Sequence, residues 1–208
     1  MIEVRVLIVE DEPIIAEDIA SALKTNDFEV SAIVYSKEDA LAELKNNQPD
    51  LVLLDINLHG GEEGIEIAKL INEKYFLPFV FLTSYSDKQT LQYAKSTEPS
   101  GYVVKPFSDA GLYATLEIAL YNHTQKNKHR FPGINLEFIN KTLPTHLSER
   151  EFVVVELIYA GKTNNQIADE LFVSINTVKA HIKSIYLKLG AFSRSTLILR
   201  LRELMLLK

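Results

Sequence analysis

Apolar residues gather in short blocks along the first half of the chain. Five apolar runs have the length of buried strands, and each is followed by a segment in which apolar residues recur at helical spacing. The runs cover residues 4–9, 28–34, 51–55, 78–84 and 101–104. Five strand–helix units in about 120 residues predict an α/β fold, a five-stranded, doubly wound parallel sheet with right-handed crossovers.

From residue 148 onward the pattern is helical throughout. SERE at 148–151 and TNNQ at 163–166 have the spacing of capping boxes, in which each side chain satisfies a free N–H group of the other residue. Ser174 is placed to cap a third helix and Gly190 to end it, and a leucine-rich segment follows. This half of the chain is predicted to form a small all-α domain.

The stretch between the two halves, residues 124–144, has no sustained periodicity. It contains two prolines, a glycine and a cluster of basic residues. Such a composition is typical of a linker or of a lightly packed segment. We therefore predict an amino-terminal domain at residues 1–123 and a carboxy-terminal domain at residues 145–208.

The net charge of −6 conceals opposite charges on the two halves. Residues 1–121 carry 21 Asp and Glu against 9 Lys and Arg, whereas residues 122–208 carry 7 against 13. An acidic first half and a basic second half indicate different partners. The second half is a candidate for binding a polyanion such as nucleic acid.

The chain has no cysteine, which excludes disulfides and thiolate metal sites. No apolar run approaches the ~20 residues that span a bilayer. The first residues, MIEVRVLIVEDE, do not resemble a signal peptide. We expect a cytoplasmic protein with no membrane partner.

Polar residues stand at the carboxyl ends of four predicted strands. Asp55 ends the third strand, and Glu10 and Asp11 follow the first. Thr83 ends the fourth strand, and Lys105 follows the fifth. Open α/β sheets place their chemistry at this edge, clustered carboxylates suit a hard cation such as Mg²⁺, and an aspartate can form an acyl phosphate. We interpret these groups as one phosphorylation site.

Four motifs, VEDEP, LLDINL, FLTSYSD and GYVVKPF, follow one another at these strand ends. Together they resemble the receiver domain of bacterial two-component response regulators, a flavodoxin-like fold, over about residues 1–121. The resemblance implies that Asp55 accepts a phosphoryl group from a sensor histidine kinase and that Thr83 and Lys105 bind this group. It also implies that Tyr102 is an aromatic switch that turns inward on activation. Asn57 and Tyr85, beside the phosphoryl position, are expected to tune hydrolysis.

The same resemblance implies a magnesium site. Asp11, Asp55 and the main-chain carbonyl of Asn57 would bind Mg²⁺, and Glu10 would act through water. One departure concerns LHGGEEG at residues 58–64, where many receivers carry a proline-containing turn. The glycines are expected to leave this loop softer, with consequences for phosphate lifetime and kinase docking.

Residues 145–208 resemble the LuxR-type helix-turn-helix of the NarL/FixJ class of response regulators. QIADEL is a short supporting helix, FVS a tight turn, and the helix from Ile175 has an inner stripe that leaves a polar outer face. A recognition helix presents such a face to the major groove of double-stranded DNA. The stripe consists of Ile175, Val178, Ile182, Ile185 and Leu189.

The resemblance places Lys179, Ala180 and Lys183 at the positions that contact base edges. Lysine prefers guanine acceptors, and alanine can meet a thymine methyl group. Contacts that position the protein without specifying sequence go to phosphates. The candidates for these contacts are Thr177, His181, Lys188 and Lys162, and Arg194 is a candidate for either role.

The leucine-rich terminus is apolar beyond what a small domain needs, with Leu197, Leu199, Leu201, Leu204 and Leu206. We infer a homodimer whose recognition helices lie about one DNA turn apart, ~34–36 Å.

These inferences describe a DNA-binding response regulator in which phosphorylation of Asp55 controls dimerisation and transcription. Its chemistry would be limited to self-catalysed phosphoryl transfer to Asp55 and slow autodephosphorylation. A receiver-domain adaptor that binds protein in place of DNA is one alternative. A small-molecule phosphatase is another, but such enzymes commonly carry a general-acid Asp two residues after the nucleophile, where this chain has Asn57.

Each residue taken alone has a plainer explanation. Asp55 is then a turn former, the Glu10–Asp11 pair an exposed helix cap, and Tyr102 a half-buried strand residue. The basic face becomes a solvated helix face with ordinary lysines, and His181 a surface histidine. The agreement of separate motifs in order and spacing favours the functional interpretation.

Overall fold

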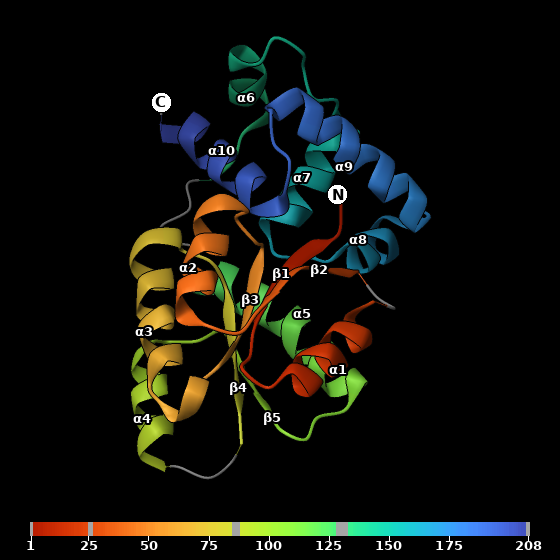
Figure 1. The fold of residues 1–208 in the computed structure, drawn as a ribbon. Helices are drawn as coiled ribbons and strands as arrows, with labels where there is room; N and C mark the ends of the chain where they lie inside the picture. Colours follow the sequence, from red (N-terminus) through yellow and green to blue (C-terminus); the bar gives the residue numbers. More distant parts are fainter. Residues whose placement is uncertain (1, 25–26, 85–87, 128–132, 207–208) are drawn as a thin grey trace. The chain divides into compact units, whose positions relative to one another are not determined.

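The computed structural model describes residues 2–24, 27–84, 88–127 and 133–206. They form two compact units (Figure 1). The sheet unit comprises Arg5–Leu120, and the helical unit comprises Met1–Val4 together with Tyr121–Lys208. The predicted effect of Tyr85 on hydrolysis lies outside the described residues.

Five strands form one parallel sheet in the order β2-β1-β3-β4-β5. Strands β1, β3 and β4 are buried along their whole length, which explains why their sequences are apolar without alternation. The predicted α/β fold is confirmed. The strands are β1 (Val4–Val9), β2 (Phe28–Val34), β3 (Leu51–Asp55), β4 (Phe79–Thr83) and β5 (Gly101–Val104).

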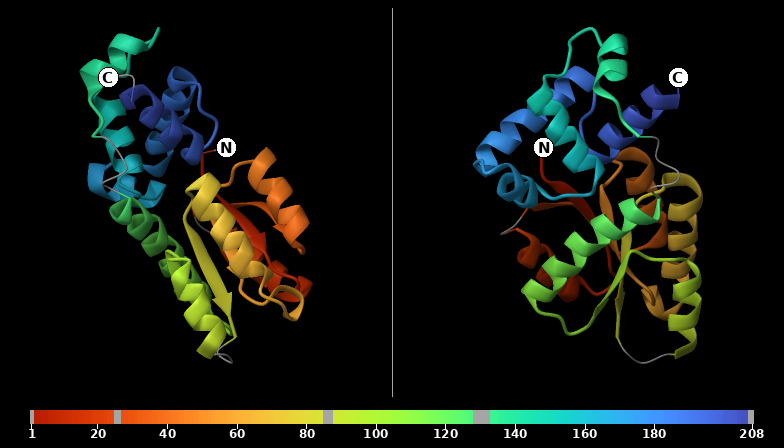
Figure 2. Two further views of the ribbon diagram at one scale, coloured as in Figure 1. Left: turned by 90° about the vertical axis from the view of Figure 1, so that its left-hand side faces the viewer. Right: turned by 180° about the vertical axis from the view of Figure 1, so that it is seen from behind.

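Helices cover both faces of the sheet (Figure 2). Helices α2, α3 and α4 lie over one face, and α1 and α5 lie over the other. A 3-10 turn, η1, follows β3, and a π-helical turn, η2, extends α3. The bounds are α1 (Pro13–Leu23), α2 (Lys37–Asn46), η1 (Leu58–Gly60), α3 (Glu63–Leu70), η2 (Ile71–Tyr75), α4 (Lys88–Ser96) and α5 (Asp109–Lys126).

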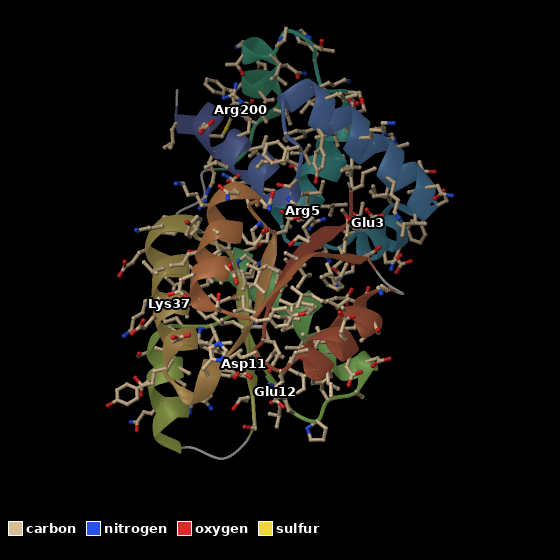
Figure 3. The ribbon with its side chains drawn as sticks, viewed as in Figure 1. Glu3, Arg5, Asp11, Glu12, Lys37 and Arg200 are labelled. Atoms are coloured by element: carbon tan, nitrogen blue, oxygen red, sulfur yellow. The ribbon has the colours of Figure 1, made fainter. Side chains whose placement is uncertain are left out.

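Two charged residues contact neighbouring elements around the sheet. Lys37 of α2, labelled in Figure 3, forms a solvent-exposed ion pair with Glu66 of α3. The buried Arg5 of β1 donates from its guanidinium to the carbonyl of Asn47 at 2.6 Å, and its main-chain N–H donates to Asp50. Arg5 therefore satisfies the end of α2 and the loop that leads into β3.

The helical unit contains five helices among its described residues. Both predicted capping boxes are present, with reciprocal bonds between Ser148 and Glu151 and between Thr163 and Gln166. Gly190, at φ 65°, ends α9 as predicted. The helices are α6 (Leu136–Thr142), α7 (Glu149–Tyr159), α8 (Asn164–Leu171), α9 (Ile175–Leu189) and α10 (Arg194–Leu206).

The structure differs from the sequence pattern at two places. The first is helix α6, which lies in the stretch where no periodic segment was expected. This helix forms because Asn135 caps its start and Ile139 anchors it in the core. In α10, Leu197, Leu201 and Leu204 are buried within the helical unit itself, so much of the apolar terminus already has a place in that core. Among the described residues, no helix combines the length and apolar character needed to span a bilayer.

Candidate functional site

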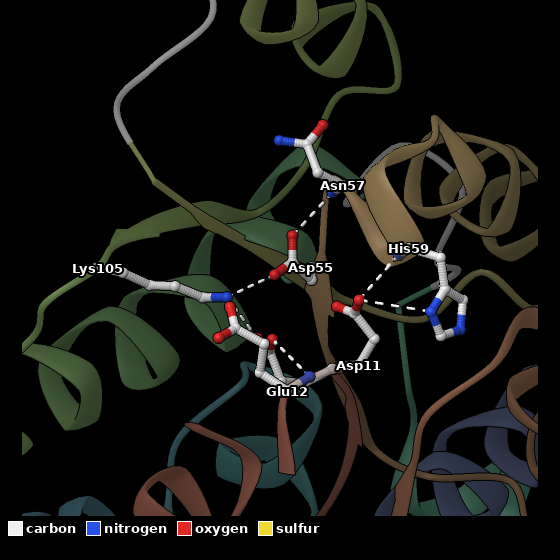
Figure 4. A network of polar contacts seen from close by, with 7 residues as sticks. Asp11, Glu12, Asp55, Asn57, His59 and Lys105 are labelled. Carbon is white, nitrogen blue, oxygen red and sulfur yellow. Dashed lines mark hydrogen bonds and ion pairs between the residues drawn. The ribbon is translucent and has the colours of Figure 1, made fainter. Parts of the chain in front are cut away.

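The acids at the carboxyl ends of the strands meet at one edge of the sheet (Figure 4). Register aligns Val9 of β1 with Leu54 of β3. Because the strands are parallel, the residues that follow them emerge at the same edge. Glu10 and Asp11 therefore lie beside Asp55, and one carboxylate oxygen from each lies within 4.8 Å of the others.

Lys105 follows β5 and places its ammonium between two of the acids. Nζ lies 2.5 Å from Oδ2 of Asp55 and 2.6 Å from Oε2 of Glu10. Burial alone would lower the pKa of Lys105, but hydrogen bonds to the two carboxylates and their charges outweigh burial and raise it. Lys105 therefore stays charged at neutral pH and offsets part of the negative charge.

Glu10 is fully buried. Burial raises the pKa of its carboxyl to about 7; the Asp55 charge adds to the rise and Lys105 opposes it. Its Oε1 accepts a weak bond from the main-chain N–H of Glu12 at 3.3 Å. Near neutral pH the carboxyl of Glu10 is therefore partly protonated, and a bound cation would favour its ionised form.

The loop after β3 closes over the acids. The main-chain N–H of Asn57 donates to Oδ1 of Asp55 at 2.8 Å, and its carbonyl accepts from Gly60 at 3.1 Å. The N–H of His59 donates to Oδ2 of Asp11 at 2.9 Å. Sequence reasoning identified the unusual glycines of this loop but missed the contact made by His59.

The donor set fits Mg²⁺. The cation prefers oxygen ligands, and the described residues supply three carboxylates within reach of one another and the carbonyl of Asn57 nearby. The structure brings together Glu10, Asp11, Asp55 and Lys105 as one cluster.

Thr83 and Tyr102 lie on the neighbouring strands. Thr83 is buried at the end of β4, and its carbonyl accepts from the N–H of Lys105 at 2.9 Å. The ring of Tyr102 packs against the sheet core, with its centroid 6.0 Å from that of Phe81. Its hydroxyl is buried without a hydrogen-bond partner among the described residues, and burial raises its pKa. The predicted switch residue therefore faces inward.

Helices α8 and α9 form a helix-turn-helix in the helical unit. Phe172 adopts a left-handed conformation that ends α8, and Ser174 caps α9 by accepting from the N–H of Thr177. Four residues of the predicted inner stripe, Val178, Ile182, Ile185 and Leu189, are buried, whereas the fifth, Ile175, is half-buried at the start of α9. The opposite face exposes Asn176, Thr177, Ala180 and Lys183.

Two lysines predicted to contact DNA are engaged within the helical unit. Nζ of Lys179 lies 2.8 Å from Oε1 of Glu3. Nζ of Lys188 lies 2.7 Å from Oε2 of the buried Glu151, which also accepts from Ser184. Lys188 thus fastens α9 to α7 and lies apart from the exposed face.

The remaining candidates also differ in exposure. His181 is half-buried, and Lys162 pairs with Glu170 at 3.2 Å. Arg194 is buried and donates to the carbonyl of Lys162 at 2.5 Å. The prediction that Arg194 contacts DNA is therefore corrected, because its guanidinium serves the packing of α10.

A parallel sheet in 2-1-3-4-5 order with acids, threonine and lysine at its carboxyl edge defines the receiver class, and the second unit carries a helix-turn-helix. The family model described as "Response regulator receiver domain" matches residues 6–117, and "Bacterial regulatory proteins, luxR family" matches residues 145–201. The chain belongs to the two-component response regulators of the NarL/FixJ class and is a DNA-binding response regulator.

Similar proteins cover nearly the whole chain. "Transcriptional regulatory protein YdfI" of Bacillus subtilis (strain 168) is 30% identical over 196 residues, 92% of each chain. "Oxygen regulatory protein NreC" of Staphylococcus aureus (strain JH9) is 28% identical over 205 residues, 93% of this chain and 94% of that protein.

Solved structures are similar to a little over half of the chain. The signal receiver domain of a modulated diguanylate cyclase from Desulfovibrio desulfuricans G20 is 32% identical, with a TM-score of 0.55 over 59% of this chain and 97% of that chain. A putative response regulator from Chloroflexus aurantiacus J-10-fl is 27% identical, with a TM-score of 0.51 over 56% and 98%.

Proposed function

We propose that Asp55 accepts a phosphoryl group from a sensor histidine kinase. The observation that carries this proposal is the convergence of Glu10, Asp11 and Lys105 on the Asp55 carboxylate. A carboxylate oxygen of Asp55 attacks phosphorus, the bond to the donor imidazole breaks, and the imidazole nitrogen keeps the electron pair. The reaction is self-catalysed transfer to the protein followed by slow hydrolysis of the acyl phosphate.

Magnesium would be held by Asp11 and Asp55 with the carbonyl of Asn57, and Glu10 would act on it through water. When bound, it neutralises the charge that develops on the phosphoryl oxygens. Lys105 supplies a compact positive charge to the same oxygens, and Thr83 supplies a hydroxyl from the end of β4.

Phosphorylation would be transmitted through Thr83 and Tyr102. Recruitment of the threonine hydroxyl to the phosphoryl group shifts the β4–α4–β5 surface between two arrangements, and the ring of Tyr102 responds to this shift. We propose a receiver at residues 1–123, a linker at 124–144 whose second half folds as α6, and a DNA-binding domain at 145–208. Dimerisation is the proposed controlled step. We place the protein in the cytoplasm, where its DNA and its kinase partner are accessible.

The exposed face of α9 would enter the major groove. Lys179, Ala180 and Lys183 would face base edges, whereas Thr177 and His181 would contact phosphates. The exposure of Thr177, Ala180 and Lys183 supports this proposal, as does the excess of basic residues after residue 121.

The first experiment tests phosphorylation. Acetyl phosphate with Mg²⁺ should label the wild-type chain, and Asp55→Asn should abolish the labelling. Asp18→Asn, which removes an exposed carboxylate from α1, is the matched control and should be labelled normally. Undiminished labelling of Asp55→Asn would refute the assignment of the nucleophile.

The second experiment tests DNA binding by electrophoretic mobility shift. Lys179→Ala with Lys183→Ala should weaken binding, whereas Lys141→Ala on the exposed surface of α6 should leave it unchanged. Normal phosphorylation without duplex binding at low salt would favour the adaptor function. Turnover of phosphomonoesters would favour a phosphatase.

A further inference from the structure

His59 connects the loop after β3 to the acid at the end of β1 (Figure 4). Its main-chain N–H donates to Oδ2 of Asp11 at 2.9 Å, and Nδ1 of its imidazole lies 3.5 Å from the same oxygen. The N–H makes a normal hydrogen bond, whereas the ring makes a longer polar contact. One carboxylate oxygen of Asp11 is thus held from two directions by a single residue.

The backbone conformation of His59 makes this contact possible. His59 has φ 51° and ψ 27°, in the left-handed region that few residues other than glycine adopt, and Gly60 follows at φ 74°. These two left-handed residues turn the chain so that the N–H of His59 faces Asp11. Histidine is among the non-glycine residues that tolerate this conformation, and a glycine would adopt it with less strain.

We propose that His59 is a positioning residue for the magnesium ligand Asp11, an inference that rests on the proposed function. Oδ2 is held by His59, which leaves the other oxygen of this carboxylate to the cation. Groups that hold metal ligands in place raise metal affinity because the ligand has less freedom to lose on binding.

Three substitutions separate the parts of this contact. His59→Gly removes the imidazole, keeps the N–H and fits the positive φ, so the fold is not put at risk. His59→Asn also tolerates this conformation and offers an amide that can donate to Asp11. His59→Pro removes the N–H and requires a negative φ, so both contacts are lost.

The measurement is the dissociation constant of Mg²⁺ for the unphosphorylated full chain by isothermal calorimetry. His59→Gly should bind Mg²⁺ about three- to tenfold more weakly. This effect is small for a residue that contacts a metal ligand, because the side chain of His59 is 58% exposed. His59→Asn should recover at least half of the loss in binding free energy, and His59→Pro should bind most weakly. His146→Gly, at an exposed histidine of the helical unit, should bind as the wild type.

Equal affinity of the wild type and His59→Gly would overturn the proposal, and so would an equal loss in the glycine and asparagine variants. Asp11→Asn separates this failure from failure of the proposed function. If the wild type binds Mg²⁺ and Asp11→Asn weakens binding, the magnesium site stands and only the role of His59 falls. If the wild type does not bind Mg²⁺, or Asp11→Asn binds equally well, the site itself is refuted.

Discussion

The ammonium of Lys105 lies 2.5 Å from Oδ2 of Asp55, so the carboxylate that we propose as the phosphoacceptor already has a cationic partner in this structure. The same ammonium lies 2.6 Å from Glu10. Under the proposed function, phosphorylation of Asp55 would require Lys105 to exchange a carboxylate partner for a phosphoryl oxygen.

Replacing Lys105 with glutamine should separate metal binding from phosphoryl transfer. Removal of one positive charge should strengthen Mg²⁺ binding by about tenfold, because the cation then meets less repulsion. Phosphorylation by acetyl phosphate should slow by about 10²-fold, because charge on the transferring group loses a stabilising partner. Calorimetry and a labelling time course measure the two effects. A loss of both Mg²⁺ binding and phosphorylation would show that Lys105 mainly supports the fold.

Glu3 should compete with DNA for Lys179, because the two side chains form an ion pair that is about one-third exposed. Glu3→Gln should tighten binding to duplex DNA by about two- to fivefold at low salt, in line with the small free energy of exposed pairs. Fluorescence anisotropy with a labelled duplex measures the change.

Two control variants separate this pair from a general charge effect. Glu137→Gln removes an equally charged group from the exposed surface of α6 and should change affinity less than Glu3→Gln. In a Lys179→Ala background, Glu3→Gln should have little further effect. An equal gain with and without Lys179 would contradict the competition.

Gly64 should tolerate no side chain. A Cβ there would lie 2.0 Å from the carbonyl oxygen of Asp55 and 2.8 Å from that of Ile56, so α3 would have to move from the end of β3. Gly64→Ala should lower the free energy of unfolding by about 2–3 kcal/mol. Urea denaturation measures the loss. Gly133→Ala is the control, because nothing lies within 4 Å of the Cβ that would be added there, and it should be neutral or slightly stabilising.

The stability of the helical unit should depend on pH through Glu151. Burial alone would raise the pKa of Glu151, but hydrogen bonds from Lys188, Ser184 and Ser148 outweigh burial and lower it to about 2. Because the folded-state pKa lies below the ordinary value of 4.5, the ionised carboxylate stabilises the fold above pH 4.5. This contribution, about 2–3 kcal/mol, is lost as the pH falls towards about 2.

Urea denaturation at several pH values, with unfolding monitored by circular dichroism, tests this dependence. Glu151→Gln should be less stable than the wild type at neutral pH, and the difference should shrink between pH 4.5 and about 2. Glu149→Gln, at an exposed neighbour in the first turn of α7, should show a smaller difference. A difference for Glu151→Gln that is independent of pH would contradict the assignment.

The acidic site could be predicted from the sequence because the strands are parallel. The carboxyl ends of β1, β3 and β5 lie at one edge of the sheet, so Glu10, Asp55 and Lys105 could be placed together without knowledge of any distance. The buried strands and the capping boxes could also be predicted, because each depends on the spacing of residues along the chain.

The missed contacts depend on conformations that sequence patterns do not encode. The contact between His59 and Asp11 requires a left-handed histidine, which the glycines beside it suggested only as a softer loop. Likewise, Arg194 and Lys188 looked like surface cations until packing placed one against a carbonyl and the other against Glu151. Helical periodicity gives the face of a residue but not the partner of a long side chain.

Glu151 has a consequence for how the DNA-binding half can be controlled. It caps α7 through Ser148 and holds Ser184 and Lys188 of α9, so the start of one helix and the middle and end of another share one carboxylate. These bonds hold α9 against α7 whenever the domain is folded. Under the proposed function, control would therefore act on the access of DNA to α9 and on the number of copies that bind one DNA site.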